Sequence, residues 1–297
     1  MHALIVLNPH AGGGAARRLI APLQGMLASL GGGLRWCAHE HWQESLAEIQ
    51  ACPRGSRIVV MGGDGTLNRY LPALLAGRHS LGLVPCGSGN DLARTLTPDL
   101  RHHWSWFLRQ ALHGPLRELD IGEARLEDRC VPFISSLTMG FDAAVARRAL
   151  GGPRWLRGLP RYLFALAREL ARTPGWPVVL EADERHIDAG EVLLASVLNT
   201  PTFGGGVRIA PGACTHDGRL DLLVAGRMGR AGVLRLVAQM LRGEHLGNPA
   251  VWQQPLRHLQ LRSGQPLPVA TDGNDLGDAC RVEVCLGAAR LPTVYSP

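Results

Sequence analysis

The apolar residues in the first part of the chain form short runs that alternate with helix-like segments. Three runs are strand-like and are followed by glycines: Ala3–Leu7, Arg57–Met61 and Leu81–Val84. Segments with helical character follow them, beginning near Ala15, Leu67 and Asn90. Strands that alternate with helices in this way predict an α/β domain with a parallel sheet.

The pattern changes near residue 122. Beyond it, short apolar runs are separated by Gly, Pro and Asp turns, as in Val131–Thr138, Glu191–Asn199 and Arg281–Leu286. This spacing is typical of an all-β sandwich with a few inserted helices. We therefore predict two domains, an α/β domain over residues 1–122 and a β-sandwich domain over residues 123–297.

Composition narrows the classes of protein. The 297 residues include no apolar stretch of the ~20 residues that a spanning helix needs. The N-terminus lacks the basic region of a signal peptide, and the 7 cysteines include no CxxC pair. These features favour a reduced, cytoplasmic setting. The net charge is +6, and every Lys+Arg position is arginine, so any cation that binds phosphate is a guanidinium.

Three junctions between a predicted strand and a glycine loop stand out: Asn8–Gly14, Gly62–Asn68 and Gly87–Asp91. In a parallel sheet they would share the carboxyl edge, where α/β folds bind ligands. Glycine loops there expose backbone N–H groups to anionic oxygens, which indicates phosphate binding. The loops match neither the GxxxxGK[ST] pattern nor a GxGxxG after the first strand.

The segment Gly62-Gly63-Asp64-Gly65-Thr66-Leu67-Asn68 resembles the GGDGTxN signature of the diacylglycerol and sphingosine lipid kinase family, whose nucleotide domain is shared with NAD kinases and phosphofructokinases. Asn8-Pro9 is similar to its NPxxG motif. Pro85–Asp91 looks like PxGTxND, with Ser88 in place of threonine. Further matches are Glu118–Gly122, Asn199, Gly204–Gly206, Pro211 and Asp217-Gly218.

The resemblance implies roles for these residues. ATP would be bound by Asn8, Gly62, Gly63, Asp64, Gly65, Thr66, Leu67, Asn68 and Ser88. A catalytic Mg²⁺ would be held by Asp64, Asp91 and Asp120, and a structural Mg²⁺ in the second domain by Asp217. Oxygen ligands suit this ion. The alternative for Asp64 and Asp91 is that they cap turns and helix starts.

One departure concerns the general base. The family's base is the glutamate of a DGE motif, and the matching segment here is Asp272-Gly273-Asn274. An amide cannot accept a proton from a lipid hydroxyl at neutral pH. Either Asp275 or Asp272 takes over as the catalytic base, or the protein is a weak or lapsed nucleotide-binding homologue.

A basic segment suggests contact with a membrane. Seven arginines fall between Ala143 and Pro177: Arg147, Arg148, Arg154, Arg157, Arg161, Arg168 and Arg172. Trp155, Leu156, Tyr162 and Trp176 are interleaved, and leucines from Leu159 to Leu170 recur at helical spacing. Such a helix can rest on an anionic leaflet. The alternative is an ordinary helix that packs its leucines on the sandwich.

The sequence therefore predicts an ATP- and Mg²⁺-dependent lipid kinase that phosphorylates a hydroxyl of diacylglycerol or a related lipid. We expect it in the cytoplasm, peripherally bound at the inner membrane face. No nucleic-acid-binding motif accompanies the charge, and a homodimer is compatible with the sequence. The alternatives are an NAD-kinase-like enzyme and a non-catalytic nucleotide- or lipid-binding regulator.

Overall fold

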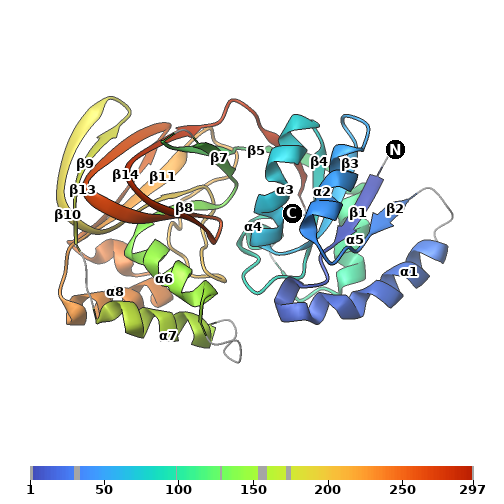
Figure 1. The fold of residues 1–297 in the computed structure, drawn as a ribbon, viewed down its shortest axis with the longest axis horizontal. Helices are drawn as coiled ribbons and strands as arrows, with labels where there is room; N and C mark the ends of the chain where they lie inside the picture. Colours follow the sequence, from blue (N-terminus) through green and yellow to red (C-terminus); the bar gives the residue numbers. More distant parts are fainter. Residues whose placement is uncertain are drawn as a thin grey trace. The chain divides into compact units, whose positions relative to one another are not determined.

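The computed structural model describes residues 3–29, 34–97, 99–127, 129–152, 159–171 and 175–295. The chain divides into two compact units. Unit 1 consists of Met1–Leu119 and Ala289–Pro297, and unit 2 of Asp120–Ala288 (Figure 1). The observed division falls close to the boundary expected near residue 122.

Unit 1 is built on a six-stranded sheet with the order β2-β1-β3-β4-β15-β5. Its strands are β1 (Ala3–Leu7), β2 (Arg35–Cys37), β3 (Arg57–Gly62), β4 (Ser80–Pro85), β5 (Leu116–Leu119) and β15 (Leu291–Val294). The pairs from β2 to β15 are parallel, and β5 is antiparallel to β15. The predicted α/β architecture is confirmed.

Helices cover both faces of this sheet (Figure 1). They are η1 (Ala11–Leu19), α1 (Ile20–Ser29), α2 (Trp42–Gln50), α3 (Asp64–Ala76), α4 (Asp91–Leu96) and α5 (Trp104–His113). Every residue of β1 and β3 is buried, as expected for parallel strands covered on two sides. On one face Ile5 and Val59 pack with Phe107 of α5.

The last strand corrects the predicted domain limits. The sequence prediction assigned residues 123–297 to the second domain, whereas β15 belongs to unit 1. Its residues Leu291–Val294 pair with β5 and contact β4, and Leu291 and Thr293 are fully buried there. The strand β15 therefore lies between β4 and β5 and joins them into one sheet.

Unit 2 contains one nine-stranded sheet, in which β12, β11, β10, β8, β13, β14, β6 and β7 are successive neighbours. The strands are β6 (Gly122–Leu126), β7 (Arg129–Phe133), β8 (Ser136–Gly140), β9 (Trp176–Ala182), β10 (Arg185–Leu198), β11 (Leu220–Gly226), β12 (Val251–Leu256), β13 (His258–Thr271) and β14 (Asn274–Leu286). Both β8 and β9 pair with the long strands β10 and β13, at different stretches of each.

This sheet curls around a single core. All nine strands contribute to one buried apolar cluster, from Ala124 on β6 to Val284 on β14. A sheet that faces itself across a core is the predicted β-sandwich architecture. The apolar run Val131–Thr138 belongs to two strands, β7 and β8, which are separated by a bend at Ile134 and Ser135.

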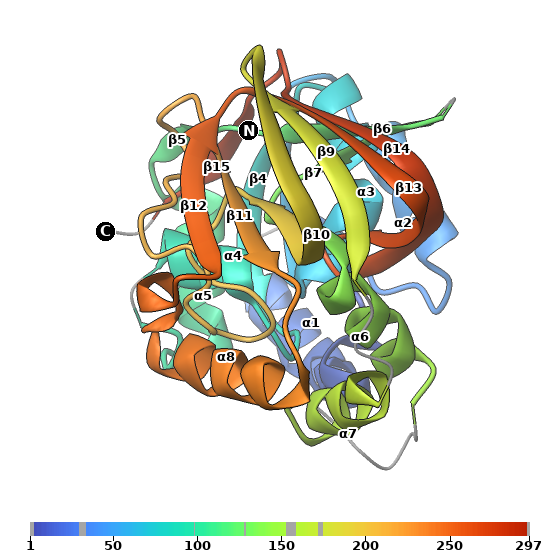
Figure 2. The same cartoon turned by 90° about the vertical axis from the view of Figure 1, so that its left-hand side faces the viewer.

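Helices of unit 2 lie along one side of its sheet (Figure 2). They are α6 (Phe141–Leu150), α7 (Leu159–Leu170), α8 (Arg230–Arg242) and the short η2 (His245–Gly247). The helix predicted from the leucine spacing is α7, and α8 was not predicted. Within the described ranges, none of the helices has the length and apolar character that crossing a bilayer requires.

Candidate functional site

The three glycine loops meet at the carboxyl edge of the parallel sheet in unit 1. The Asn8 backbone N–H donates to Met61 O at 3.0 Å, and Cys86 N–H donates to Gly62 O at 2.9 Å. The Asn8 side-chain Nδ2 donates to Thr66 Oγ1 at 2.7 Å. The loops after β1, β3 and β4 are thus tied together, as the sequence predicted from their positions.

Glycine is required where these loops touch. A Cβ on Gly63 would lie 2.7 Å from the Cα of Gly87, and one on Gly12 would lie 2.7 Å from Cys86 O. These neighbours are backbone atoms, which cannot move aside as a flexible side chain would. Gly12 also has φ +60°, in the left-handed region that favours glycine. The close packing exposes backbone rather than side chains at this edge.

The N-terminus of α3 begins inside this cluster of loops. Its N-cap residue is Gly63, which has no side chain to cap the helix, and the helix runs for 13 residues. Such a terminus favours an anionic ligand through its dipole and its first N–H groups. Gly62 ends β3, Gly65 lies on the first turn of α3, and the exposed Ser88 lies in the loop after β4.

Leu67 and Asn68, two of the residues predicted to bind ATP, make contacts within unit 1. The Leu67 side chain is fully buried, and its N–H donates to Gly63 O at 3.1 Å, so it serves the core and the helix. Asn68 lies on the first turns of α3, half-buried and already engaged within the chain.

The carboxylate of Asp64 contacts the backbone at the start of α4, where Asp91 is the first residue. The Asp91 N–H donates to Asp64 Oδ2 at 3.1 Å, and the Leu92 N–H donates to Asp64 Oδ1 at 3.2 Å. Asp64 therefore caps the start of α4. Capping a helix start was the alternative role considered for this residue from the sequence, and the structure shows that Asp64 has it. Carboxylate oxygens such as those of Asp64 and Asp91 are the ligands that Mg²⁺ prefers together with nucleotide phosphates.

Asn90 is a site residue that the sequence interpretation did not single out. It has φ +57°, and its Oδ1 accepts from Gly87 N–H at 2.8 Å while its Nδ2 donates to Gly87 O at 2.9 Å. This two-way contact fixes the third glycine loop. The available signal was the residue type, since Asn tolerates the left-handed region better than most side chains.

Asp120, the third predicted ligand of the catalytic Mg²⁺, begins unit 2. It is buried, its N–H donates to Thr215 O at 2.7 Å, and its Oδ2 accepts from Gly218 N–H at 2.6 Å. It is thereby tied to the turn that contains the exposed Asp217, whose Oδ1 accepts from Arg219 N–H at 3.0 Å. Within the described ranges, no three His, Cys, Asp or Glu side chains are grouped closely enough to hold a metal ion.

The Asp272 carboxylate is hydrogen-bonded to the backbone of unit 2. Asp272 and Gly273 form the turn between β13 and β14, with φ +46° and +80°, the conformation that Asp-Gly favours in tight hairpins. The buried carboxylate accepts three backbone N–H groups at 2.8–2.9 Å, from Ile134, Ser135 and Ser136. A base must have an oxygen available to the substrate, so this geometry argues against the tentative assignment of Asp272 as the catalytic base.

Asp275 lies on β14, near the same turn. It pairs with Arg147 Nε of α6 at 2.9 Å, and its Oδ1 accepts from Gly277 N–H at 3.1 Å. Arg147 also contacts Asp278 at 2.7 Å. Asn274 pairs across the hairpin with Thr271. Of the two tentative bases, Asp275 is the one at the surface.

An apolar cavity lies among α6, α7, β10 and α8 of unit 2. Its lining is Phe141, Asp142, Leu163, Leu166, Leu193, Leu194, Phe203, Gly204, Val207, Ile209, Val233, Leu236, Val237, Met240 and Leu241. Among these described residues only Asp142 ionises. Burial raises the pKa of its carboxyl to about 7, although the Ser196 hydroxyl donates to it at 2.5 Å. This cavity could not be predicted from the sequence, because its lining residues are ordinary apolar side chains scattered along the chain.

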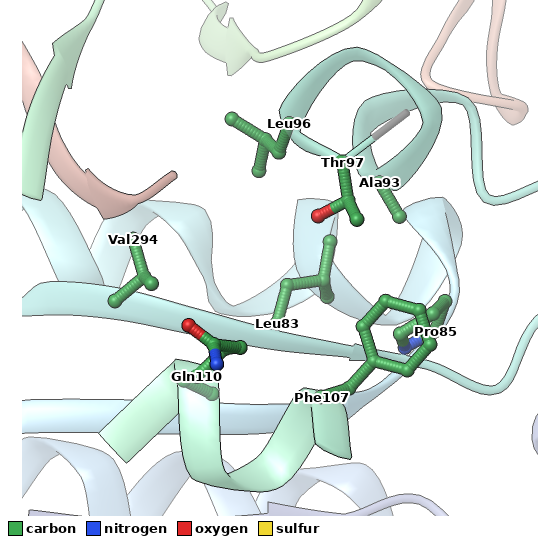
Figure 3. Close-up of a pocket in the computed structure, with 9 residues that line it drawn as sticks. Leu83, Pro85, Ala93, Leu96, Thr97, Phe107, Gln110 and Val294 are labelled. Carbon is green, nitrogen blue, oxygen red and sulfur yellow. The ribbon is translucent and has the colours of Figure 1, made fainter. Parts of the chain in front are cut away.

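A second, smaller pocket lies in unit 1 among β4, α4, α5 and β15 (Figure 3). Its lining is apolar apart from Thr97 and Gln110. Its nine described lining residues include none of the predicted ATP or Mg²⁺ ligands. It is therefore distinct from the predicted ATP and Mg²⁺ sites.

The predicted membrane segment is only partly described. Arg148 pairs with the buried Glu169, and the Arg168 guanidinium lies 5.4 Å from the ring centroid of Phe164. Several members of the segment lie outside the described residues: Arg154, Trp155, Leu156, Arg157 and Arg172, as well as the side chains of Arg161 and Tyr162.

Two family profiles match the chain. The diacylglycerol kinase catalytic domain matches residues 2–124, and the YegS C-terminal NAD kinase beta sandwich-like domain matches residues 135–291. A diacylglycerol kinase from Mycobacterium tuberculosis is 30% identical over 190 residues, which are 64% of this chain and 61% of that protein. The matched part thus spans less than two thirds of this relative.

Solved structures share the fold. A diacylglycerol kinase from Bacillus anthracis superimposes with a TM-score of 0.74 at 20% identity, covering 99% of this chain and 97% of that one. An NAD kinase from Archaeoglobus fulgidus in complex with ATP gives 0.54 at 12% identity, covering 99% and 93%. With both profiles matched in order along the sequence, the chain belongs to the diacylglycerol kinase family of YegS-like proteins.

Proposed function

We propose that the chain is an ATP-dependent lipid kinase that transfers the γ-phosphoryl group of ATP to a hydroxyl of diacylglycerol or a related amphiphilic lipid. The observation that carries the proposal is the close packing of the glycine loops, with Gly63 against Gly87 and Gly12 against Cys86. Backbone packed this closely around a helix N-terminus can surround phosphate oxygens. The NAD kinase with the similar fold was solved with ATP.

We assign Mg²⁺ to the carboxylates of Asp64 and Asp91. When bound, the ion would neutralise charge on the phosphate oxygens. The N–H groups of Asp91 and Leu92 hold the Asp64 carboxylate in position. From the family resemblance we also assign Asp120 to the catalytic ion and Asp217 to a separate structural ion.

A lipid acceptor is favoured over a soluble nucleotide by the lining of the unit 2 cavity. Hydrocarbon side chains from α7, β10 and α8 line it almost throughout, and Asp142 supplies the one ionisable group among the described residues. An acyl chain is compatible with such a lining, whereas the phosphates of NAD would lose hydration there without gaining a cationic partner.

Phosphoryl transfer has a loose transition state and depends mainly on positioning and charge stabilisation. We therefore propose that transfer proceeds without the family's glutamate, and that Asp275 accepts the proton of the lipid hydroxyl. The second candidate function is a lapsed nucleotide-binding homologue, which Asn274 favours because its amide cannot act as a base.

The test is incubation with Mg²⁺ and ATP radiolabelled on the γ-phosphate, with extracted total lipids in one reaction and NAD in another. Label in the lipid phase supports the proposal. Label in NADP would instead indicate an NAD-kinase-like enzyme. Binding of ATP with transfer to neither acceptor would indicate the lapsed homologue.

A further inference from the structure

The solvent-exposed side of α8 consists of arginine, leucine and alanine. Its exposed residues are Arg230, Ala231, Leu234, Arg235, Leu241 and Arg242, which we call the α8 face. Leu234 and Leu241 are 53% and 56% exposed. Positions 230, 234 and 241, and likewise 231, 235 and 242, fall on one side of a helix. Two exposed leucines between three arginines form an amphipathic surface toward solvent.

The α8 face borders the mouth of the apolar cavity. Leu241 lines the cavity and is also exposed to solvent. Leu163 of α7 likewise lines the cavity and is 43% exposed. A side chain that has both properties marks an opening. Figures 1 and 2 show α7 and α8 on the same side of the unit 2 sheet. The exposed leucines and the cavity lining are therefore continuous.

The charge around this mouth is positive. The sequence of α8 contains no Asp or Glu, and Glu169 of α7 is buried in its pair with Arg148. The nearest acid after α8 is Glu244, which lies 3.8 Å from Arg242 with both groups largely exposed. Arg235 has no acidic partner among the described residues. Arg168 adds a further exposed cation on α7.

We propose that the α8 face, together with Leu163 and Arg168, docks on a bilayer leaflet that contains anionic phospholipid. The leucines would enter the boundary between head groups and acyl chains, and the arginines would pair with lipid phosphates. The purpose of docking rests on the proposed function, since it places the cavity mouth where the hydrocarbon chain of a lipid can enter without crossing water. Binding itself does not require turnover.

A second copy of the chain fits this surface less well. In a symmetric contact the same patch occurs on both partners. The arginines of one α8 face would then meet those of the other, and like charges in contact repel. An anionic leaflet offers the complementary charge.

The test is flotation of the whole chain, without ATP, with vesicles of phosphatidylcholine alone or with added phosphatidylglycerol. Wild type should bind the anionic vesicles and bind neutral ones at least about tenfold more weakly. Leu234→Gln with Arg235→Gln should weaken anionic binding by about tenfold or more, and Leu234→Met with Arg235→Lys should retain it. Neither Leu234 nor Arg235 belongs to the cavity lining, so both double variants leave that lining intact.

The matched control removes one exposed apolar and one exposed arginine side chain from the sheet of unit 2, by Val179→Gln with Arg262→Gln, and should bind as wild type. Circular dichroism verifies folding of each variant. Docking at α8 is overturned if the α8 double variant binds as wild type, if the control loses binding equally, or if lipid-free wild type dimerises through α8. Vesicle binding without phosphate transfer would leave docking intact and refute the kinase proposal alone.

Discussion

A Cβ atom on Gly63 would lie only 2.7 Å from the Cα of Gly87, although the two glycines belong to different loops. Gly63 is the N-cap of α3, and Gly87 is fixed by Asn90 through two hydrogen bonds. The separation of the second and third loops is therefore set by backbone contact. The proposed phosphate site therefore has no room for a side chain at either glycine.

Substitution Gly63→Ala tests this contact. The added methyl group must push Gly87 away, so we expect a loss of about 1–3 kcal/mol in unfolding free energy and weaker ATP binding. Chemical denaturation and equilibrium ATP binding measure the two effects. The control is Gly25→Ala in α1, where a Cβ has nothing within 4 Å, and it should be neutral or slightly stabilising. Equal behaviour of the two variants would contradict the contact.

Asp64 has two roles that one substitution can separate. In Asp64→Asn the amide nitrogen cannot accept from α4, so stability should fall by about 1 kcal/mol. Phosphate transfer should fall much further, by roughly 100-fold, because the proposed Mg²⁺ loses a carboxylate ligand. Thermal unfolding and radiolabel transfer report the two effects. The control Asp99→Asn, at a half-exposed aspartate of the same unit, should leave transfer unchanged. Full transfer by Asp64→Asn would rule out the Mg²⁺ assignment.

The two aspartates near the β13–β14 turn should behave differently. Because Asp272 accepts three backbone N–H groups, Asp272→Asn should cost about 1–3 kcal/mol of stability. Asp275→Asn, at a half-exposed ion pair with Arg147, should cost at most about 1 kcal/mol but reduce transfer. Denaturant unfolding and transfer rates of both variants check this. Unchanged transfer by Asp275→Asn would remove it as the base.

The buried carboxyl of Asp142 predicts a dependence of stability on pH. Burial raises its pKa from 3.8 to about 7, so the folded chain holds a proton that the unfolded chain releases. This contribution is complete below about pH 4 and is lost as the pH rises toward 7, at up to about 1.4 kcal/mol per pH unit. Asp142→Asn does not titrate there. Unfolding free energies measured from pH 4 to 8 should fall more steeply for wild type; parallel curves would contradict the prediction.

The glycine loops could be predicted from the sequence because they depend on local features. Each follows a short apolar strand, and parallel strands place their carboxyl ends together. The partners of the acidic residues could not be predicted. Asp64 caps α4, 27 residues further along, and Asp272 binds N–H groups more than 130 residues away. Hydrogen bonds of this range follow from the folded topology, and no spacing in the sequence encodes them.

The strand, helix and cavity that the sequence did not predict were missed for similar reasons. The strand Leu291–Val294 is too short to be assigned to unit 1 without knowledge of the gap between β4 and β5. The helix α8 has few buried residues, Val233 and Leu236, so its apolar pattern points partly outward. The cavity beside it is lined by residues from Phe141 to Leu241, each of which resembles ordinary core.

The most direct measurement is the initial rate of γ-phosphate transfer from radiolabelled ATP to diacylglycerol in mixed micelles, with and without Mg²⁺. Wild type should produce labelled lipid at a rate that depends on Mg²⁺ and falls roughly 100-fold in Asp64→Asn. Wild-type protein that binds ATP but yields no labelled product from diacylglycerol or from extracted total lipids would contradict the assignment as a lipid kinase.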